Sequence, residues 1–253
     1  MDGSAQATHR HGISDEEWEA RVDLAMGYRM AFHYGWSNLI YNHLTVRVPG
    51  TANQMLIKPH DLLYEEVRAS NLLKIDFSGK ALNERDGNVN AAGYQIHSAV
   101  MEARPDVNAV VHLHPTAGIA ISASKVGLLP ASQTAMLYYN RIAYHDYEGI
   151  ADGPDEKQRL QRDIGKFNMV VLRNHGLLTC GVSIAQALFN MRQFVVACEA
   201  QAMAMAMGEL NLCSPELAEA TARQWEKYDV MNAIDNRKAY LRLCDKYHPD
   251  YNT

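Results

Sequence analysis

Apolar and polar residues follow two different periods along this chain, and each period predicts one type of element. A segment with helical spacing begins after Ser14, a suitable N-cap because Glu17 follows it three residues later. Gly35 is a suitable end for this helix. A second long segment, residues 183–207, is apolar on more than one face. This pattern predicts a helix buried on two sides, in the core or in a subunit interface.

Between these two segments, short apolar stretches alternate with helical ones, and turn residues separate them. The predicted strands are 43–50, 54–59, 71–82 as a pair turning at Ser78-Gly79, 107–114, 141–149, and 167–181 as a pair broken at Asn174–Gly176. The predicted helices are 90–104, capped by Asn90 and ending before Pro105, then 115–127 and 155–165, and a helical tail within 214–253. We expect a mobile leader at residues 1–13 and one α/β domain over residues 14–253, because no linker interrupts the series.

Composition narrows the class of protein. The 253 residues are 47% hydrophobic and 21% charged, with a net charge of −5, which favours a soluble protein without a nucleic-acid partner. Four scattered cysteines without a CxxC pair indicate reduced thiols. The polar start MDGSAQATHRHG is no signal peptide, and no apolar stretch is long enough to cross a bilayer. We therefore expect a cytoplasmic protein with no membrane partner.

Two histidines in AVVHLHPTAG are the first candidates for chemistry. Residues i and i+2 of a strand point to the same face, about 6.5 Å apart, so His112 and His114 can share one metal ion. His175 is a candidate third ligand, because Gly176 lets the backbone turn beside it. Three histidines with an open coordination position are typical of a catalytic metal site. The spacing alone also allows an ordinary hydrogen-bonded pair.

Four blocks of sequence resemble the class II aldolase/adducin family, in the family's order. They are GWSNLIYNHLTVRVPG, MLIKPHDLLYEEVRASNLLKID, HSAVMEARPDVNAVVHLHPTAGIAISASKVGLLP and VVLRNHGLLTCG, within roughly residues 17–210. The resemblance implies a three-layer α/β/α fold and often a homotetramer. It also implies a divalent transition metal (Mn, Zn, Fe or Co) on His112, His114 and His175.

One departure from the family concerns proton transfer. The family's aldolases and epimerases carry a glutamate four residues before a histidine, in the helix that precedes the HxH pair. There the glutamate neighbours the metal and acts as a base. In this chain the matching histidine is His97, and Gly93 stands where the glutamate would be. An aldolase that depends on that glutamate is therefore disfavoured.

A second departure concerns the substrate. YNHLTVR, KPHD and VNAAG stand where the family's aldolases build a phosphate cradle from small residues. Backbone N–H groups in small-residue turns suit a phosphate. The side chains of His43, Lys58, His60 and Asp61 suit a carboxylate instead. We therefore expect a small-molecule carboxylate substrate that is not phosphorylated.

The preferred interpretation is a metal-dependent lyase, of decarboxylase or aldolase type, that cleaves a C–C bond of an aromatic, 2-oxo or hydroxy carboxylic acid. His60 is the candidate proton donor, and Lys58, His43 and His97 are candidate substrate contacts. Each has a structural alternative, with Lys58 as a turn residue, His60 as a loop residue and His97 as a core histidine. Two other functions stay open: a non-haem iron oxygenase of a phenolic 2-oxo acid, and a non-catalytic adducin-like interaction module.

Overall fold

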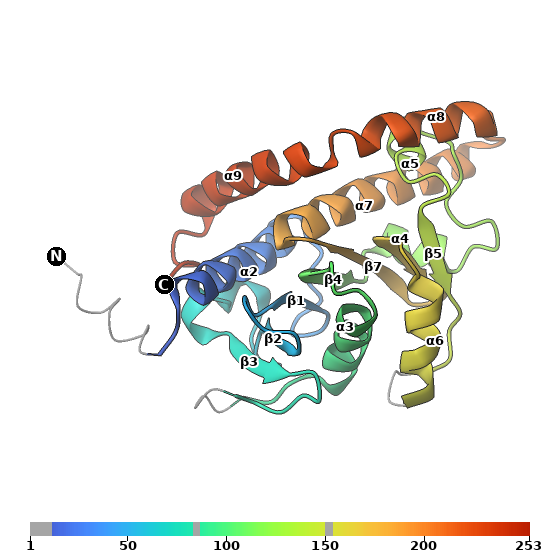
Figure 1. Ribbon diagram of the computed structural model, residues 1–253. Coiled ribbons are helices and arrows are strands. Elements are labelled where there is room, and N and C mark those ends of the chain that lie inside the picture. Colours follow the sequence, from blue (N-terminus) through green and yellow to red (C-terminus); the bar gives the residue numbers. More distant parts are fainter. Residues whose placement is uncertain (1–11, 83–86, 150–153) are drawn as a thin grey trace.

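The computed structural model describes residues 12–82, 87–149 and 154–253, and within them a seven-stranded sheet separates two layers of helices (Figure 1). The strand order is β3-β2-β1-β4-β7-β6-β5, and every neighbouring pair is antiparallel except β5 and β6. The strands are β1 (His43–Arg47), β2 (Gln54–Ile57), β3 (Leu73–Asp76), β4 (Ala109–Leu113), β5 (Ile142–His145), β6 (Met169–Leu172) and β7 (Gly176–Gly181).

Helices cover both faces of this sheet. On one face lie α2 (Asp15–His33), α4 (Thr116–Ser122), α5 (Gln133–Met136) and α7 (Ile184–Met207), with α8 (Pro215–Glu226) and α9 (Asp229–Tyr247) outside α7. On the other face lie α3 (Ala91–Ala103) and α6 (Pro154–Ile164). Two short 3₁₀ helices, η1 (Tyr64–Glu66) and η2 (Ala69–Asn71), connect β2 to β3.

The alternation of side chains along β4 shows how the sheet divides the core. Val111 and Leu113 face the layer of α2 and α7, whereas Val110 faces the layer of α3 and α6. Both sets are fully buried, because each face of the strand is covered by helices. The expected three-layer α/β/α fold is confirmed. His112 and His114 follow the alternation of Val110, so their side chains belong to the α3/α6 face.

Several local predictions are confirmed. Ser14 Oγ accepts a hydrogen bond from the Glu17 N–H at 3.2 Å, and Asn90 Oδ1 accepts one from the Gly93 N–H at 3.3 Å. Helix α7 packs against β4 and β7 on one side and α9 on the other, which explains its apolar faces. The predicted tail is two helices, α8 and α9. All four cysteines are free thiols.

Other predictions differ from the structure. The predicted helix 115–127 ends at Ser122, because a turn closes between Ser124 O and the Gly127 N–H, where Gly127 has a φ of 63°. The second half of the predicted pair 71–82 is a single bridge between Ile75 and Ala81. Helix α5 was not predicted. Of the predicted leader, residues 1–11 lie outside the described residues. No helix in the described part of the chain could span a bilayer.

Strand directions bring several chain segments to one end of the sheet. Strand β4 ends there and β1 begins there, so His43 pairs with His112 in register. Strands β5 and β6 also end there, and β7 begins there after the β6–β7 turn, with His145 opposite Leu172. We call this end of the sheet, on its α3/α6 face, the histidine end. The opposite end of the same face, where β1 and β3 finish, is the arginine end.

Candidate metal centre

Three histidines converge at the histidine end. His112 lies in β4, His114 follows that strand, and His175 lies in the turn between β6 and β7. Their ring centroids are 4.7–4.9 Å apart, and one ligand nitrogen from each lies within 4.8 Å of the others. The structure thus brings together the three residues expected as metal ligands.

Hydrogen bonding fixes which nitrogen His112 offers. Its Nδ1–H donates to the Leu177 carbonyl oxygen at 3.0 Å, and a carbonyl only accepts, so Nε2 carries the lone pair. The Nε2 atoms of His112 and His114 are 3.0 Å apart. Two nitrogens that each bind one zinc-like ion at about 2.0–2.1 Å lie about 3 Å from one another. The donor set therefore fits a divalent transition metal.

The protonation of the three imidazoles also suits metal binding. Burial and repulsion from neighbouring histidines hold the pKa of His112 well below its usual range. The same causes lower the pKa of His114 to about 4, and burial followed by the charge of His145 lowers the pKa of His175. All three rings are therefore neutral near pH 7, which is the form that binds a metal.

Gly176 is required beside the third histidine, although for a different reason than expected. The left-handed backbone conformation belongs to Asn174, with a φ of 57°. A Cβ on Gly176 would lie 2.7 Å from His114 Cδ2 and 2.8 Å from the Leu113 carbonyl oxygen. Glycine therefore permits the close packing of the turn against the end of β4.

A buried chain of side chains extends from the metal centre into the α3/α6 layer. His43 Nδ1 lies 2.9 Å from His97 Nε2, and His97 Nδ1 lies 2.6 Å from Thr45 Oγ1. The His43 and His112 rings are 5.3 Å apart. Burial first, and neighbouring histidines second, hold the pKa of both His43 and His97 well below the usual range. His97 is fully buried and both of its ring nitrogens have partners.

Gly93 lies directly under the His43 ring. A Cβ at this position would lie 2.7 Å from His43 Cδ2 and 3.0 Å from His43 Nε2. Real Cβ atoms do not approach this closely, so any larger residue would displace the ring. The space beside the Cα of Gly93 is thus filled by an imidazole that comes from β1.

Lys58, an expected substrate contact, has its ammonium group among backbone carbonyl oxygens. Its Nζ donates to the carbonyl oxygens of Ile40, Pro59, His60 and Leu62 at 2.8–3.2 Å. An ammonium group has three donors, so these carbonyls use all of them. Burial lowers the Lys58 pKa to about 8, and the charges of Asp61 and Glu66 act against this shift. Lys58 holds the loop after β2 in place.

His60 and Asp61 lie in that loop, at the histidine end. The His60 side chain is partly exposed, and its ring centroid is 6.1 Å from that of Tyr41. Its backbone N–H donates to the Asn88 carbonyl oxygen at 2.8 Å. His60 is therefore a loop residue with a side chain free to meet a ligand.

A further histidine–carboxylate pair at this end was not predicted. His145, at the end of β5, lies 2.8 Å through Nδ1 from Asp163 Oδ2, near the end of α6. The two residues are 18 positions apart in different elements, and neither belongs to a recognisable motif. Only the packing of α6 against β5 brings them together.

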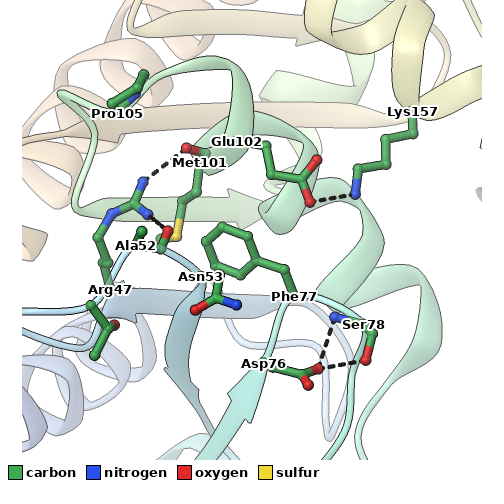
Figure 2. Close-up of a pocket in the computed structure, with 11 residues that line it drawn as sticks. Arg47, Ala52, Asn53, Asp76, Phe77, Ser78, Met101, Glu102, Pro105 and Lys157 are labelled. Atoms are coloured by element: carbon green, nitrogen blue, oxygen red, sulfur yellow. Dashed lines mark hydrogen bonds and ion pairs between the residues drawn. The ribbon is translucent and has the colours of Figure 1, made fainter.

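A cavity of about 770 Å³ lies at the arginine end, away from the histidines (Figure 2). Arg47 lines it, and its guanidinium donates to the carbonyl oxygens of Met101 and Ala52. Lys157 and Glu102 form an ion pair across its rim at 2.8 Å. Arg47, Glu102 and Lys157 therefore already have partners within the chain.

Comparisons with known proteins agree with the fold. The chain matches the family model of the class II aldolase and adducin N-terminal domain over residues 22–202. The crystal structure of an aldolase II superfamily protein from Pseudomonas syringae is 39% identical and superposes with a TM-score of 0.93, covering 97% of this chain and 100% of that one.

Two relatives show the breadth of this similarity. A Pseudomonas aeruginosa protein named for the class 2 aldolases, PA3430, is 43% identical over 249 residues, which cover 94% of each chain. Alpha-adducin of Rattus norvegicus is 46% identical over 189 residues, which cover 74% of this chain but 26% of alpha-adducin. The sequence resemblance is confirmed, and the chain belongs to the class II aldolase and adducin family.

Proposed function

We propose that the protein is a metal-dependent carbon–carbon lyase, of decarboxylase or aldolase type, for a non-phosphorylated carboxylic acid. The observation that carries this proposal is the convergence of three neutral imidazoles at the open end of a rigid sheet. Membership of the family supports a lyase. The substrates that suit such a site are aromatic, 2-oxo or hydroxy acids, because two oxygens of these acids can chelate one metal ion.

His112, His114 and His175 would hold the metal, as Mn, Zn, Fe or Co. When bound, this ion supplies Lewis acidity, which stabilises negative charge on a substrate oxygen as the C–C bond breaks. His112 is buried and its ring is fixed by Leu177, whereas His114 and His175 are partly exposed. A ligand would therefore approach from the side of His114 and His175.

His43 is the proposed substrate contact within the buried chain. Its Nδ1 is engaged by His97, so its Nε2 is the nitrogen left for a ligand. His97 positions His43 and does not reach the substrate, because both nitrogens of His97 have partners. Lys58 makes no substrate contact in this proposal, since backbone carbonyls use its donors.

His60 is the proposed proton donor to the substrate carbon whose C–C bond has been cleaved. It lies at the histidine end, its side chain is partly exposed, and histidine can donate a proton near neutral pH. His60→Gln keeps a polar side chain of similar reach but cannot act as an acid. This variant should lower kcat while leaving the metal content unchanged.

The first test is metal analysis after anaerobic purification without chelators, with the His112→Ala/His114→Ala double variant as control. We expect a near-stoichiometric transition metal in the parent and none in the double variant. Parent and variant are then assayed against 2-oxo and hydroxy aromatic acids for released CO2 or aldehyde. Turnover that consumes O2 would show that the protein is an iron oxygenase and not a lyase. Absence of a metal after incubation with each ion would refute the lyase and favour an adducin-like interaction module.

We also propose that the protein acts as a homotetramer in the cytoplasm. Exposed apolar side chains near the end of α7, including Met203 and Met207, support burial against another subunit. Four free thiols support a reducing compartment. Light scattering on the purified protein should give four times the 28.3 kDa chain mass. A monomer would refute the tetramer, and recovery in a periplasmic fraction would refute the location.

A further inference from the structure

A histidine–carboxylate pair lies beside the metal centre and has no role in the proposed reaction. His145 Nδ1 and Asp163 Oδ2 are 2.8 Å apart, and 6% of the His145 side chain is exposed. His145 faces the α3/α6 layer, as Ala143 does two residues earlier in β5. The pair thus shares the sheet face that carries the three candidate ligands.

The charge of Asp163 sets the direction of this hydrogen bond. Burial acts to raise the pKa of Asp163, but the hydrogen bond from His145 and contacts with Arg162 outweigh it and hold that pKa below its usual value. The carboxylate is therefore ionised near neutral pH and can only accept a hydrogen bond. His145 Nδ1 therefore donates to Asp163, and in this tautomer Nε2 carries the lone pair and can accept a hydrogen bond.

That acceptor has no partner among the described residues, although it is buried. Leaving a buried polar atom without a hydrogen bond destabilises the fold, so a partner is expected. His145 and His175 line the same crevice, whose apolar walls are Ile96, Leu160 and Leu172. Its volume is about 10 Å³. One water needs about 10–15 Å³, so a water fits and a substrate does not.

We propose that Asp163 and His145 position His175 for metal binding through one bridging water in this crevice. The water would donate to His145 Nε2 and accept from the ring N–H of His175. This arrangement would leave the other nitrogen of His175 free to face His112 and His114. The inference rests on the proposed metal centre.

His112 provides a precedent within the same centre. Its Nδ1–H donates to the Leu177 carbonyl oxygen, which fixes the tautomer and the ring orientation. Metal-bound histidines usually donate their second N–H to a carboxylate, carbonyl or water. His175 lies in the turn between β6 and β7, and its ring has no hydrogen-bond partner of this kind in the described ranges 12–82, 87–149 and 154–253. The Asp163–His145 pair would provide from β5 and α6 what Leu177 provides from β7.

Titration of Co(II) into the metal-free protein tests this role, with visible absorption as the readout. His145→Phe should weaken Co(II) binding by about 10- to 100-fold and shift the absorption bands, because the ring of His175 loses its orientation. Asp163→Asn should act in the same direction with a smaller effect. His145→Gln, whose amide oxygen can accept from the water, should recover part of the loss.

Glu148→Gln is the matched control. Glu148 lines the same crevice but pairs with Arg159, and Co(II) binding should be unchanged. Circular dichroism of each metal-free variant establishes that it is folded. If the parent binds Co(II) and His145→Phe binds it equally, with the same spectrum, the positioning role is refuted and the metal centre stands. If the parent binds no Co(II), both proposals are refuted.

Discussion

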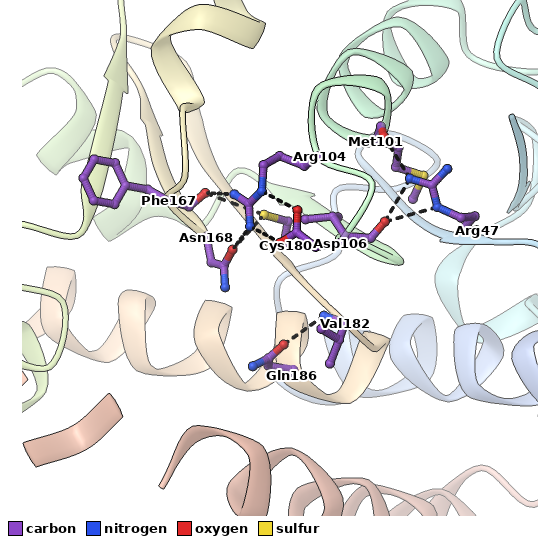
Figure 3. Close-up of polar contacts among 10 residues, drawn as sticks. Arg47, Met101, Arg104, Asp106, Phe167, Asn168, Cys180, Val182 and Gln186 are labelled. Atoms are coloured by element: carbon purple, nitrogen blue, oxygen red, sulfur yellow. Dashed lines mark hydrogen bonds and ion pairs between the residues drawn. The ribbon is translucent and has the colours of Figure 1, made fainter. Parts of the chain in front are cut away.

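The two ends of one sheet face use polar side chains in opposite ways. At the arginine end, Arg47 and Arg104 are permanently charged, and their donors are directed at fixed acceptors (Figure 3). Arg47 donates to the carbonyls of Val107 and Met101 at 2.8–3.2 Å, and Arg104 donates to those of Phe167 and Asn168 at 3.0–3.1 Å. Asn168 accepts through its side-chain carbonyl. At the histidine end, neutral rings face one another with nitrogens available.

The two ends thus differ in whether their polar groups are already hydrogen-bonded. Those of the arginine end stabilise the fold, whereas those of the histidine end are suited to bind a ligand. Carbonyls exposed where strands begin and end need donors, and a guanidinium with five N–H groups provides several at once. A neutral imidazole has one N–H donor and one lone pair, so rings packed within 5 Å of one another cannot provide several donors at once. We propose that a ligand from outside the chain completes the histidine end.

The largest expected effect comes from removing the ligands at the histidine end. His112→Ala/His114→Ala should lose the metal and lower kcat/KM by about 1,000-fold or more, because a Lewis acid contributes several kcal/mol. The metal-free melting temperature should change little by comparison. Retention of activity with no bound metal would contradict the assignment.

An arginine-end variant should show the reverse pattern. Arg47→Met keeps the apolar stem but leaves the carbonyls of Val107 and Met101 without their charged donor. We expect a loss of about 2 kcal/mol in the free energy of unfolding, measured in urea, with unchanged Co(II) affinity. Weaker Co(II) binding in this folded variant would show that the two ends are coupled.

Gly93→Ala probes the contact with the His43 ring. The added methyl group would lie 2.7 Å from His43 Cδ2, so the ring must shift within a tightly packed layer. We expect about 1–3 kcal/mol of destabilisation and a lower kcat/KM. Adding His43→Ala should remove most of the extra destabilisation, because the two residues are in contact. Strict additivity would refute the contact.

Below pH 6.5, the histidine end should also give the free energy of unfolding a pH dependence that the arginine end does not. His43, His97 and His112 have pKa values well below 6.5 in the fold, so the unfolded chain binds more protons below that pH. Metal-free stability should therefore fall as the pH drops below 6.5, by up to about 1.4 kcal/mol per pH unit for each such histidine.

A comparison of variants shows which residues cause this pH dependence. The slope in urea unfolding between pH 6.5 and 5.5 should be shallower in His112→Ala/His114→Ala, because two of the neutral histidines are gone. Arg47→Met should lower the free energy of unfolding by the same amount at every pH, so that its slope against pH is unchanged. An unchanged slope in the histidine variant would place the responsible groups elsewhere.

The features predicted correctly from the sequence are those that depend on residues close together in the chain. The HxH pair follows from the alternation of a strand, and the caps at Ser14 and Asn90 follow from local hydrogen bonding. His175 was placed through the family resemblance and the adjacent Gly176. These features depend on a few neighbouring residues, so a single sequence can reveal them.

Contacts between distant elements were not predictable in the same way. Lys58 looked like an anion-binding residue, but its role depends on where Ile40 and the loop after β2 place their carbonyls. His145 and Asp163 meet only because α6 returns along β5. Such pairings require the packed layers, which residue spacing does not encode.

The position of β4 in the middle of the sheet has a consequence for how the chain folds. His112 and His175 lie more than 60 residues apart in the sequence, and β4 must pair with β7 before these candidate ligands meet. Such long-range pairings form slowly and late. A metal ion added to a refolding chain should therefore bind all three proposed ligands only late in folding. The time at which the metal binds would then report when β4 and β7 have paired.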